Sequence, residues 1–216
     1  RPERGIGRIC VAVEDQLPQP LACVPPSGSL FPLDVNTTVN CTDKDANNNT
    51  ANASFKILVQ DKTPPTLTVP GDTAVEADGP GGSIVNFIAK SNDLVDGEKD
   101  ATCAPASGSL FALGDTDVDC SAVDAHANAA TPRKFTISVM DTTAPIVSVP
   151  ADITKEATSP QGAAIDFTVS ALDTVSGAIS PVCIIGPDHE VHAGDFFAVG
   201  EKTVTCSAID GAGNKG

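Results

Sequence analysis

Acidic side chains recur at matching positions along this chain and offer the oxygen ligands of a cation site. Three pairs of carboxylates are each separated by 80 residues: Asp61 and Asp141, Glu76 and Glu156, and Asp93 and Asp173. Carboxylate oxygens are the ligands that Ca²⁺ takes in proteins. These six residues are therefore candidate ligands of calcium sites at the junctions between repeated stretches of sequence. The alternative is that they are ordinary solvated charges.

A shorter acidic segment, Asp43-Lys44-Asp45-Ala46-Asn47, alternates oxygen-bearing side chains as calcium loops do. A related pair of residues occurs three times, at Asp45/Asn49, Asp124/Asn128 and Asp210/Asn214. Asp and Asn favour turns because their side chains hydrogen-bond the nearby backbone. The repetition therefore favours a recurring turn over a calcium loop.

The seven cysteines form three evenly placed pairs with one residue left over. Cys23, Cys103 and Cys183 lie 80 residues apart, and 17 to 23 residues after each comes a second cysteine, at Cys41, Cys120 and Cys206. One pair per repeat predicts one disulfide per repeat, each worth about 3 kcal/mol in the chain-entropy model. Disulfides place the chain in an oxidising compartment. Zinc is the competing interpretation, but no C-x-x-C or Cys/His quartet is present. Cys10 has no counterpart, and is either a free thiol or bonded outside this chain.

Two further groups of residues could carry chemistry. Asp188-His189-Glu190-Val191-His192 combines imidazoles and carboxylates, but it lacks the HExxH spacing, so we expect a solvated loop. Four N-x-Ser/Thr sequons begin at Asn36, Asn40, Asn48 and Asn52, all within 17 residues of one another. They predict a glycan-coated face in a secreted protein. The alternative is a Thr/Asn-rich strand and turn without sugar.

Composition excludes several classes of function. The formal net charge of −15 disfavours nucleic acid and anionic membranes. No apolar run approaches the length of a membrane span. The sequence has no GxSxG, HExxH, P-loop or GxGxxG context, so we expect no enzyme. The absence of Trp and Tyr argues against stacking platforms for sugars or single-stranded nucleic acid.

The elements that must position these residues are short strands. The 18 Gly and 17 Pro residues interrupt the chain too often for long helices. The segment 135–139 alternates apolar and polar residues as a half-buried strand does, and 55–59 is its earlier copy. Together with the 80-residue spacing, this predicts an all-β chain of tandem immunoglobulin-like antiparallel β-sandwiches in a rod.

Proline-containing links mark the predicted boundaries. Asp61-Lys62-Thr63-Pro64-Pro65 and Asp141-Thr142-Thr143-Ala144-Pro145 stand at equivalent positions, each between two predicted strands. Proline stiffens such links. The predicted units are 1–60, without its first strand, 61–140, which is complete, and 141–216, without its closing strand.

These motifs together resemble the hyalin repeat, or HYR domain. The resemblance rests on the segment 103–111, Cys-Ala-Pro-Ala-Ser-Gly-Ser-Leu-Phe, followed by 118–124, Asn128 and 135–141, with related motifs in the other two copies. The third copy departs from it through an insertion, 186–197, where the Ser-Gly-Ser turn is expected. The resemblance implies an immunoglobulin-like sandwich in extracellular, adhesive or matrix proteins, without catalysis.

Three functions follow from this resemblance and from the missing edge strands. The first is a secreted structural array whose copies join head to tail into a filament, because an open sandwich edge can accept a strand from a neighbour. The second is a cell-surface adhesin that binds cell-surface or matrix components. The third is an accessory spacer segment of a larger secreted enzyme.

Overall fold

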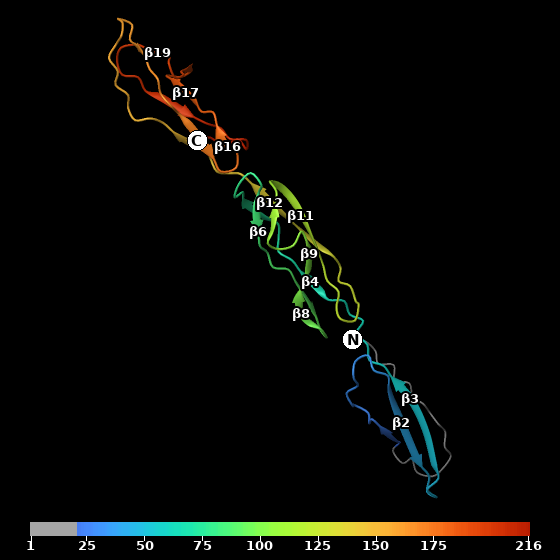
Figure 1. Cartoon of the computed structure of the whole chain (residues 1–216). Coiled ribbons are helices and arrows are strands. Elements are labelled where there is room, and N and C mark those ends of the chain that lie inside the picture. The colour runs from blue at the N-terminus through green and yellow to red at the C-terminus, as the bar shows by residue number, and fades with distance from the viewer. Residues whose placement is uncertain (1–20) are drawn as a thin grey trace. The chain divides into compact units, whose positions relative to one another are not determined.

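The computed structural model of the chain describes residues 21–216, which form strands and turns only (Figure 1). This confirms the predicted all-β class. Cys10, for which the sequence left two alternatives open, lies outside the described residues. The chain divides into two compact units, Arg1–Lys62 and Thr63–Gly216. The division falls close to the predicted boundary at 60/61, whereas the boundary predicted at 140/141 lies inside the second unit. Over 21–216, no helix is long and apolar enough to cross a membrane.

The described part of the first unit, residues 21–62, contains an antiparallel sheet in the order β1-β2-β3. Its strands are β1 (Ala22–Val24), β2 (Thr37–Lys44) and β3 (Thr50–Ile57). Val39 and Cys41 are buried while Asn40 between them is exposed, so β2 has the alternation of a half-buried strand. The sheet therefore presents one apolar and one polar face.

The central segment of the second unit, residues 63–140, contains three sheets. Its strands are β4 (Thr66–Thr68), β5 (Thr73–Glu76), β6 (Ser83–Val85), β7 (Lys90–Asp93), β8 (Gly97–Asp100), β9 (Thr102–Ala104), β10 (Ser109–Phe111), β11 (Gly114–Ser121) and β12 (Arg133–Met140). They pair in the orders β4-β7-β8, β10-β6 and β5-β12-β11-β9. The pairing of β5 with β12 is parallel. This pair departs from the predicted antiparallel sandwich, because β5 joins the edge of β12 from far back in the sequence and no short turn links the two strands.

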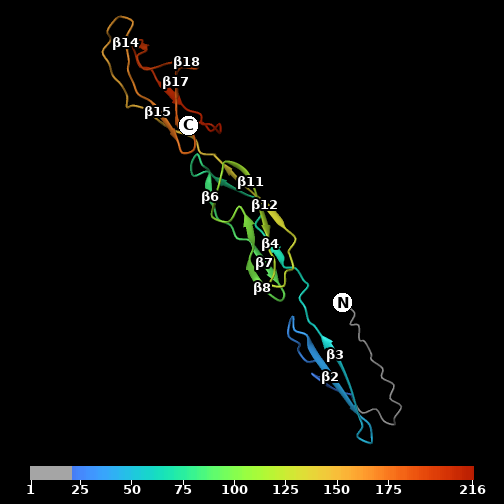
Figure 2. The ribbon, with the colours of Figure 1, turned by 45° about the vertical axis from the view of Figure 1, so that its right-hand side comes forward.

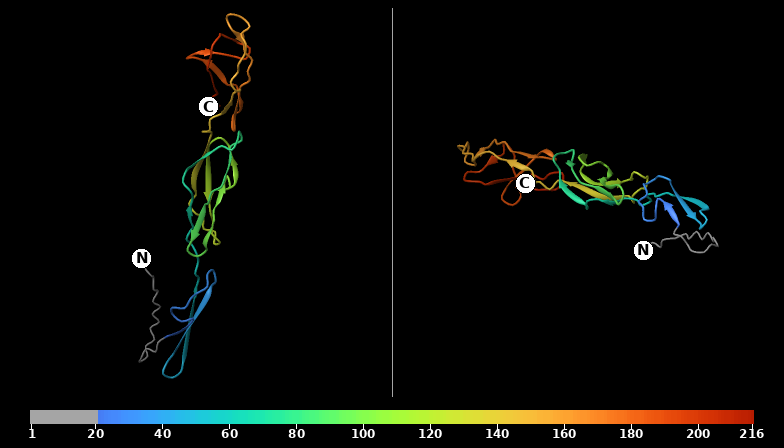
Figure 3. Two further views of the ribbon diagram at one scale, coloured as in Figure 1. Left: turned by 90° about the vertical axis from the view of Figure 1, so that its left-hand side faces the viewer. Right: turned by 90° about the horizontal axis from the view of Figure 1, so that it is seen from below.

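The C-terminal segment, residues 141–216, ends in the red part of the ribbon (Figures 1 and 3). It repeats most of the pairings of the central segment. Its strands are β13 (Ile146–Ser148), β14 (Ala163–Ala164), β15 (Ser170–Asp173), β16 (Gly177–Ile179), β17 (Val182–Ile185), β18 (His189–Glu190), β19 (Phe196–Phe197) and β20 (Val204–Ser207). The sheet β13-β15-β16 corresponds to β4-β7-β8, and the pair β14-β19 corresponds to β6-β10. The insertion 186–197 supplies β18 and β19. β18 extends the sheet that contains β17, and β19 takes the place of β10 of the central segment.

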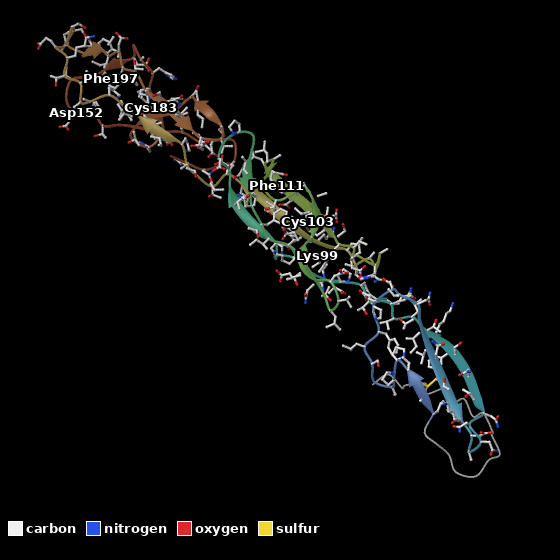
Figure 4. All side chains as sticks on the ribbon, turned by 60° about the horizontal axis from the view of Figure 1, so that its bottom comes forward. Lys99, Cys103, Phe111, Asp152, Cys183 and Phe197 are labelled. Carbon is white, nitrogen blue, oxygen red and sulfur yellow. A yellow bond between two sulfur atoms is a disulfide. The ribbon has the colours of Figure 1, made fainter. Side chains whose placement is uncertain are left out.

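The best-formed core belongs to the central segment. Phe111, Val118, Ile137 and Val139 are each at most 1% exposed, and the ring of Phe87 meets that of Phe135 edge-on at 5.0 Å between centroids. Figure 4 shows Phe111 among the strands of this segment. The alternation predicted for 135–139 thus supplies the β12 side of the core.

Each predicted cysteine pair forms a disulfide between directly opposed residues of neighbouring strands. The bonds are Cys23–Cys41, Cys103–Cys120 and Cys183–Cys206. They join β1 to β2, β9 to β11 and β17 to β20. Each bond therefore fixes the register of one strand pair and does not bridge two sheets.

Substitution of Gly82, the residue before β6, tests how closely the backbone approaches β10, the strand that pairs with β6. The φ of Gly82 is +104°, and a Cβ on this residue would overlap the carbonyl oxygen of Phe111. We expect Gly82→Ala to destabilise the second unit by at least about 1–3 kcal/mol, measured by denaturant unfolding. Gly81→Ala is the matched control, because a Cβ added at Gly81 would have no atom within 4 Å. Equal stability of the two variants would contradict the packing described here.

Candidate metal centre

Three aspartates from distant parts of the second unit meet where the central and C-terminal segments join. Asp141 directly follows β12, Asp173 is the last residue of β15, and Asp210 follows β20. One carboxylate oxygen of each lies within 4.8 Å of those of the other two. The C-terminal turn that carries Asp210 lies beside the β15–β16 hairpin in two views (Figures 1 and 2), and the Gly211 N–H donates to Ser176 Oγ at 3.0 Å.

The cluster is largely withdrawn from water. Asp173 is 5% and Asp210 8% exposed, and Asp141 is partly buried. Asp141 Oδ2 and Asp173 Oδ2 are buried atoms without a hydrogen-bond partner among the described residues. Burying an ionised oxygen without a partner is costly unless a positive charge compensates it. The two atoms therefore indicate a place for a cation.

Backbone N–H groups donate hydrogen bonds to the Oδ1 atoms of two of the carboxylates and so fix the orientation of these side chains. Asp173 Oδ1 accepts from the N–H groups of Val175, at 2.8 Å, and Ser176, at 2.7 Å. Asp210 Oδ1 accepts from three N–H groups, those of Ala212, Gly213 and Asn214. Both side chains are thus oriented by their own turns, and no large rearrangement is needed before an ion binds.

Asn214 connects the C-terminal turn to the link between the segments. Its Nδ2 donates to Asp210 Oδ2 at 2.8 Å and to the carbonyl oxygens of Asp141, at 3.1 Å, and Thr143, at 3.3 Å. The same turn occurs at Asp124/Asn128 and Asp45/Asn49, where each Asp Oδ2 accepts from the Asn amide. The recurring turn expected from the sequence is therefore present, and at Asp210 it also contributes to an acidic cluster.

Glu76, the last residue of β5 in the central segment, accepts hydrogen bonds from the link residues Thr142 and Thr143. Its Oε1 accepts from the Thr142 N–H at 2.9 Å and from Thr143 Oγ1 at 2.8 Å, and its Oε2 accepts from Thr142 Oγ1 at 2.6 Å. These hydrogen bonds, those from Thr142 first, lower the pKa of Glu76. Glu76 therefore positions the residues that follow Asp141, whereas Glu156, its sequence counterpart, is exposed and belongs to no acidic cluster of the described residues.

The electrostatics of the cluster differ from one carboxylate to the next. Burial raises the pKa of Asp141, and the charges of Asp173, Asp210 and Glu76 add to this effect. For Asp210, burial is the largest single influence and opposes ionisation, but the hydrogen bonds from Asn214, Gly213 and Ala212 together outweigh it and lower the pKa. Without a cation, burial and the neighbouring carboxylates thus oppose the ionisation of Asp141.

The geometry fits one shared cation with oxygen ligands. Two oxygens that each lie about 2.4 Å from a single Ca²⁺ can be no more than about 4.8 Å apart, and the three aspartates meet this limit. No nitrogen or sulfur ligand is in the group, which favours Ca²⁺ or Mg²⁺ over zinc. Asp141, Asp173 and Asp210 would hold the ion.

A similar pair stands at the other end of the central segment. Asp93 ends β7 and Asp124 follows β11, and one oxygen of each lies within 4.8 Å of the other. Asp93 Oδ1 accepts from Val95 N and Asp96 N, while Asp93 Oδ2 is buried without a partner among the described residues. Asp61 belongs to the first unit, so its predicted role as a ligand stays a prediction.

The histidine-containing segment of the C-terminal insertion places the exposed His192 side chain close to two carboxylates. His192 Nε2 lies 3.3 Å from Glu190 Oε1, and His192 Nδ1 lies 3.7 Å from Asp195 Oδ2. His189 and Glu190 form the short strand β18, and both are exposed. The segment is therefore partly a strand rather than only a loop, and it contributes to no metal cluster within 21–216. The side chain of His126 is only 18% exposed, and its Nδ1 lies 3.4 Å from Asp96 Oδ2.

Sequence reasoning missed Asp210 and Asp124 as candidate ligands because their turn motif was a sufficient explanation for them. The signal was nonetheless present, since each of these Asp residues follows the second cysteine of its repeat by four residues. Because the turn follows the cysteine-bearing strand at the same distance in each copy, it lies at the same end of each copy.

Comparison with known proteins finds three similarities to this chain. The family model of the HYR domain matches residues 140–216. Hyalin from Strongylocentrotus purpuratus is 31% identical over 200 residues, which cover 87% of this chain and 16% of hyalin. The chain thus spans about a sixth of the length of that relative. A solved protocadherin gammaB7 EC3-6 cis-dimer structure aligns with a TM-score of 0.35 at 16% identity, over 84% of this chain and 56% of that chain. Residues 140–216 therefore match the HYR domain, and most of the chain is similar in sequence to part of hyalin.

Proposed function

We propose that this chain is a segment of a secreted, non-catalytic structural protein whose consecutive repeats are held together by calcium. The observation that carries the proposal is that Asp141, Asp173 and Asp210 lie close together, and that two of them have a buried oxygen with no hydrogen-bond partner within residues 21–216. The link residue, the β15 end and the C-terminal turn each supply one ligand. An ion bound to all three would restrain the link between the segments.

The extracellular role is supported by three further findings. The HYR match and the similarity to hyalin point to an extracellular protein of adhesion type, and the three disulfides suit an oxidising compartment. Assembly of copies into a filament or surface matrix is part of the proposal.

Calcium titration of the full chain by isothermal calorimetry tests the proposal. We expect Asp173→Asn to bind one Ca²⁺ fewer per chain than the wild type, because the amide cannot replace the charge of the buried Oδ2 oxygen. The substitution preserves shape, and its side-chain oxygen can still accept from Val175 N and Ser176 N.

Asp152→Asn is the matched control. It removes the same charge from an exposed residue of the same segment (Figure 4), and we expect it to bind calcium as the wild type does. The proposal fails if the wild type binds no calcium, or if Asp173→Asn binds as many ions as the Asp152→Asn control.

A further inference from the structure

The β2–β3 hairpin of the first unit carries four sequons that the proposed calcium-linked array does not use. Their asparagines are all exposed, and so is the third residue of three of them. The sequons are Asn36-Thr37-Thr38, Asn40-Cys41-Thr42, Asn48-Asn49-Thr50 and Asn52-Ala53-Ser54. None lies in the second unit, so the feature distinguishes the first unit from the two segments that follow.

Two of the sequons interlock across the paired strands. In the register of β2 and β3, Asn40 faces Ser54 and Thr42 faces Asn52. Each asparagine thus stands opposite the hydroxyl-bearing residue of the other sequon, on the face that points away from buried Val39 and Cys41. Thr42 Oγ1 donates to Asn52 Oδ1 at 2.9 Å. This hydrogen bond uses the oxygen of the Asn52 amide and not Nδ2, the atom that carries an N-linked sugar.

A third sequon occupies the tip of the hairpin. Asn48 has a φ of +64°, in the left-handed region that asparagine tolerates, and it lies within the turn that Asp45 and Asn49 close. The equivalent turns in the second unit place Asp124 beside Asp93 and Asp210 beside Asp173. Within 21–216, Asp45 belongs to no such acidic group. The first copy of the turn therefore presents a sugar acceptor where the later copies contribute to acidic clusters.

We propose that the β2–β3 hairpin is an N-glycosylated surface, with Asn36, Asn40, Asn48 and Asn52 as the acceptors. In the transfer, the side-chain nitrogen of asparagine attacks the anomeric carbon of a lipid-pyrophosphate-linked oligosaccharide. The new N–C bond forms as the C–O bond to pyrophosphate breaks. The lipid pyrophosphate leaves, and a base of the transferase takes the proton from the amide nitrogen. The secretory machinery of the producing cell supplies both the donor and the enzyme.

The placement of these sites has a consequence for binding. Asn40 and Asn52 are diagonal neighbours on one sheet face, roughly 7–8 Å apart. Two glycans rooted this close together cover the outer face of the hairpin and exclude another protein from it. The polar face of the first unit is therefore a solvated shield, and adhesive or assembly contacts use other surfaces.

Secretion of the full chain from an animal cell line tests this inference. We expect digestion with peptide N-glycosidase F to lower the intact mass and to convert all four asparagines to aspartate, as mapped on tryptic peptides. Asn40 and Asn52 unmodified in the secreted wild type would overturn the proposal, even with sugar at Asn36 or Asn48. This readout needs no variant, and it does not depend on calcium binding.

Matched variants assign one glycan to the interlocked pair. Thr42→Ala removes the Asn40 sequon and should lose one glycan, whereas Thr42→Ser preserves both the sequon and a hydroxyl and should lose none. Thr37→Ala is the control, because it changes a residue of the same strand while leaving every sequon intact. Retention of the Asn40 glycan in Thr42→Ala would contradict the assignment.

Discussion

Chelation of calcium is expected to lower the unfolding temperature of the wild-type second unit and to leave that of Asp173→Asn nearly unchanged. A ligand that binds only the folded state at a hundred times its dissociation constant stabilises it by about 2.7 kcal/mol. In the wild type this gain is lost with the ion, and the aspartates of the cluster are left close together and largely buried. Differential scanning calorimetry of the full chain, with and without chelator, measures the difference.

The same calorimetry also compares the stabilities of the two proteins without calcium. In chelator, Asp173→Asn should be more stable than the wild type, because the charge of Asp173 contributes to the raised pKa of Asp141. A carboxyl whose pKa is raised on folding contributes stability that is present below its ordinary pKa and is lost as pH rises through the raised value. At neutral pH the ion-free wild type therefore carries this cost. A chelator effect of equal size in both proteins would show that calcium acts elsewhere.

Phe111→Ala is expected to produce the largest loss of stability of any single side-chain truncation in the central segment. Phe111 is 1% exposed and packs in the cluster that contains Val118 and Ile137. Removing a buried phenylalanine side chain costs about 3–5 kcal/mol through lost transfer energy and the cavity that remains.

Hydrogen exchange of the β11 and β12 amides measures this loss within the central segment, and Leu110→Ala provides its control. Leu110 is the preceding residue of the same strand but is 62% exposed, so its truncation should change stability by less than about 0.5 kcal/mol. Similar protection in the two variants would mean that β10 does not cover the core as described.

Much of the fold could be predicted from local patterns. The alternation of Phe135, Ile137 and Val139 with polar residues predicted β12, since residues two apart in a strand share a face. The spacing of the cysteines predicted which of them bond, because each pair recurs once per repeat. These features depend on short stretches of sequence and on their repetition, and both are visible without a structure.

The parallel pairing of β5 with β12 could not be predicted in this way. It joins Thr73 to Ile137 and Glu76 to Met140, and nothing in either segment alone specifies the other. Its consequence is functional, because it brings the Glu76 carboxylate to the threonines that follow Asp141. The sequence placed Glu76 among calcium ligands, whereas the structure gives its oxygens to Thr142 and Thr143.

The candidate site could be predicted only in part for the same physical reason. Asp141 and Asp173 were identified by their spacing from Asp61 and Asp93, and the structure brings these two together. Asp210 was assigned to a turn alone, because its hydrogen bonds to the local backbone account for its presence there. A side chain whose one oxygen serves a turn can still offer the other to an ion, and only the three-dimensional arrangement reveals that second use.

A crystal structure of the full chain grown with calcium, with anomalous difference density recorded, tests the central claim most directly. The account predicts one peak bound by carboxylate oxygens of Asp141, Asp173 and Asp210 at about 2.3–2.6 Å, and no such peak in Asp173→Asn. A wild-type crystal in saturating calcium with no anomalous peak among these three residues would contradict it.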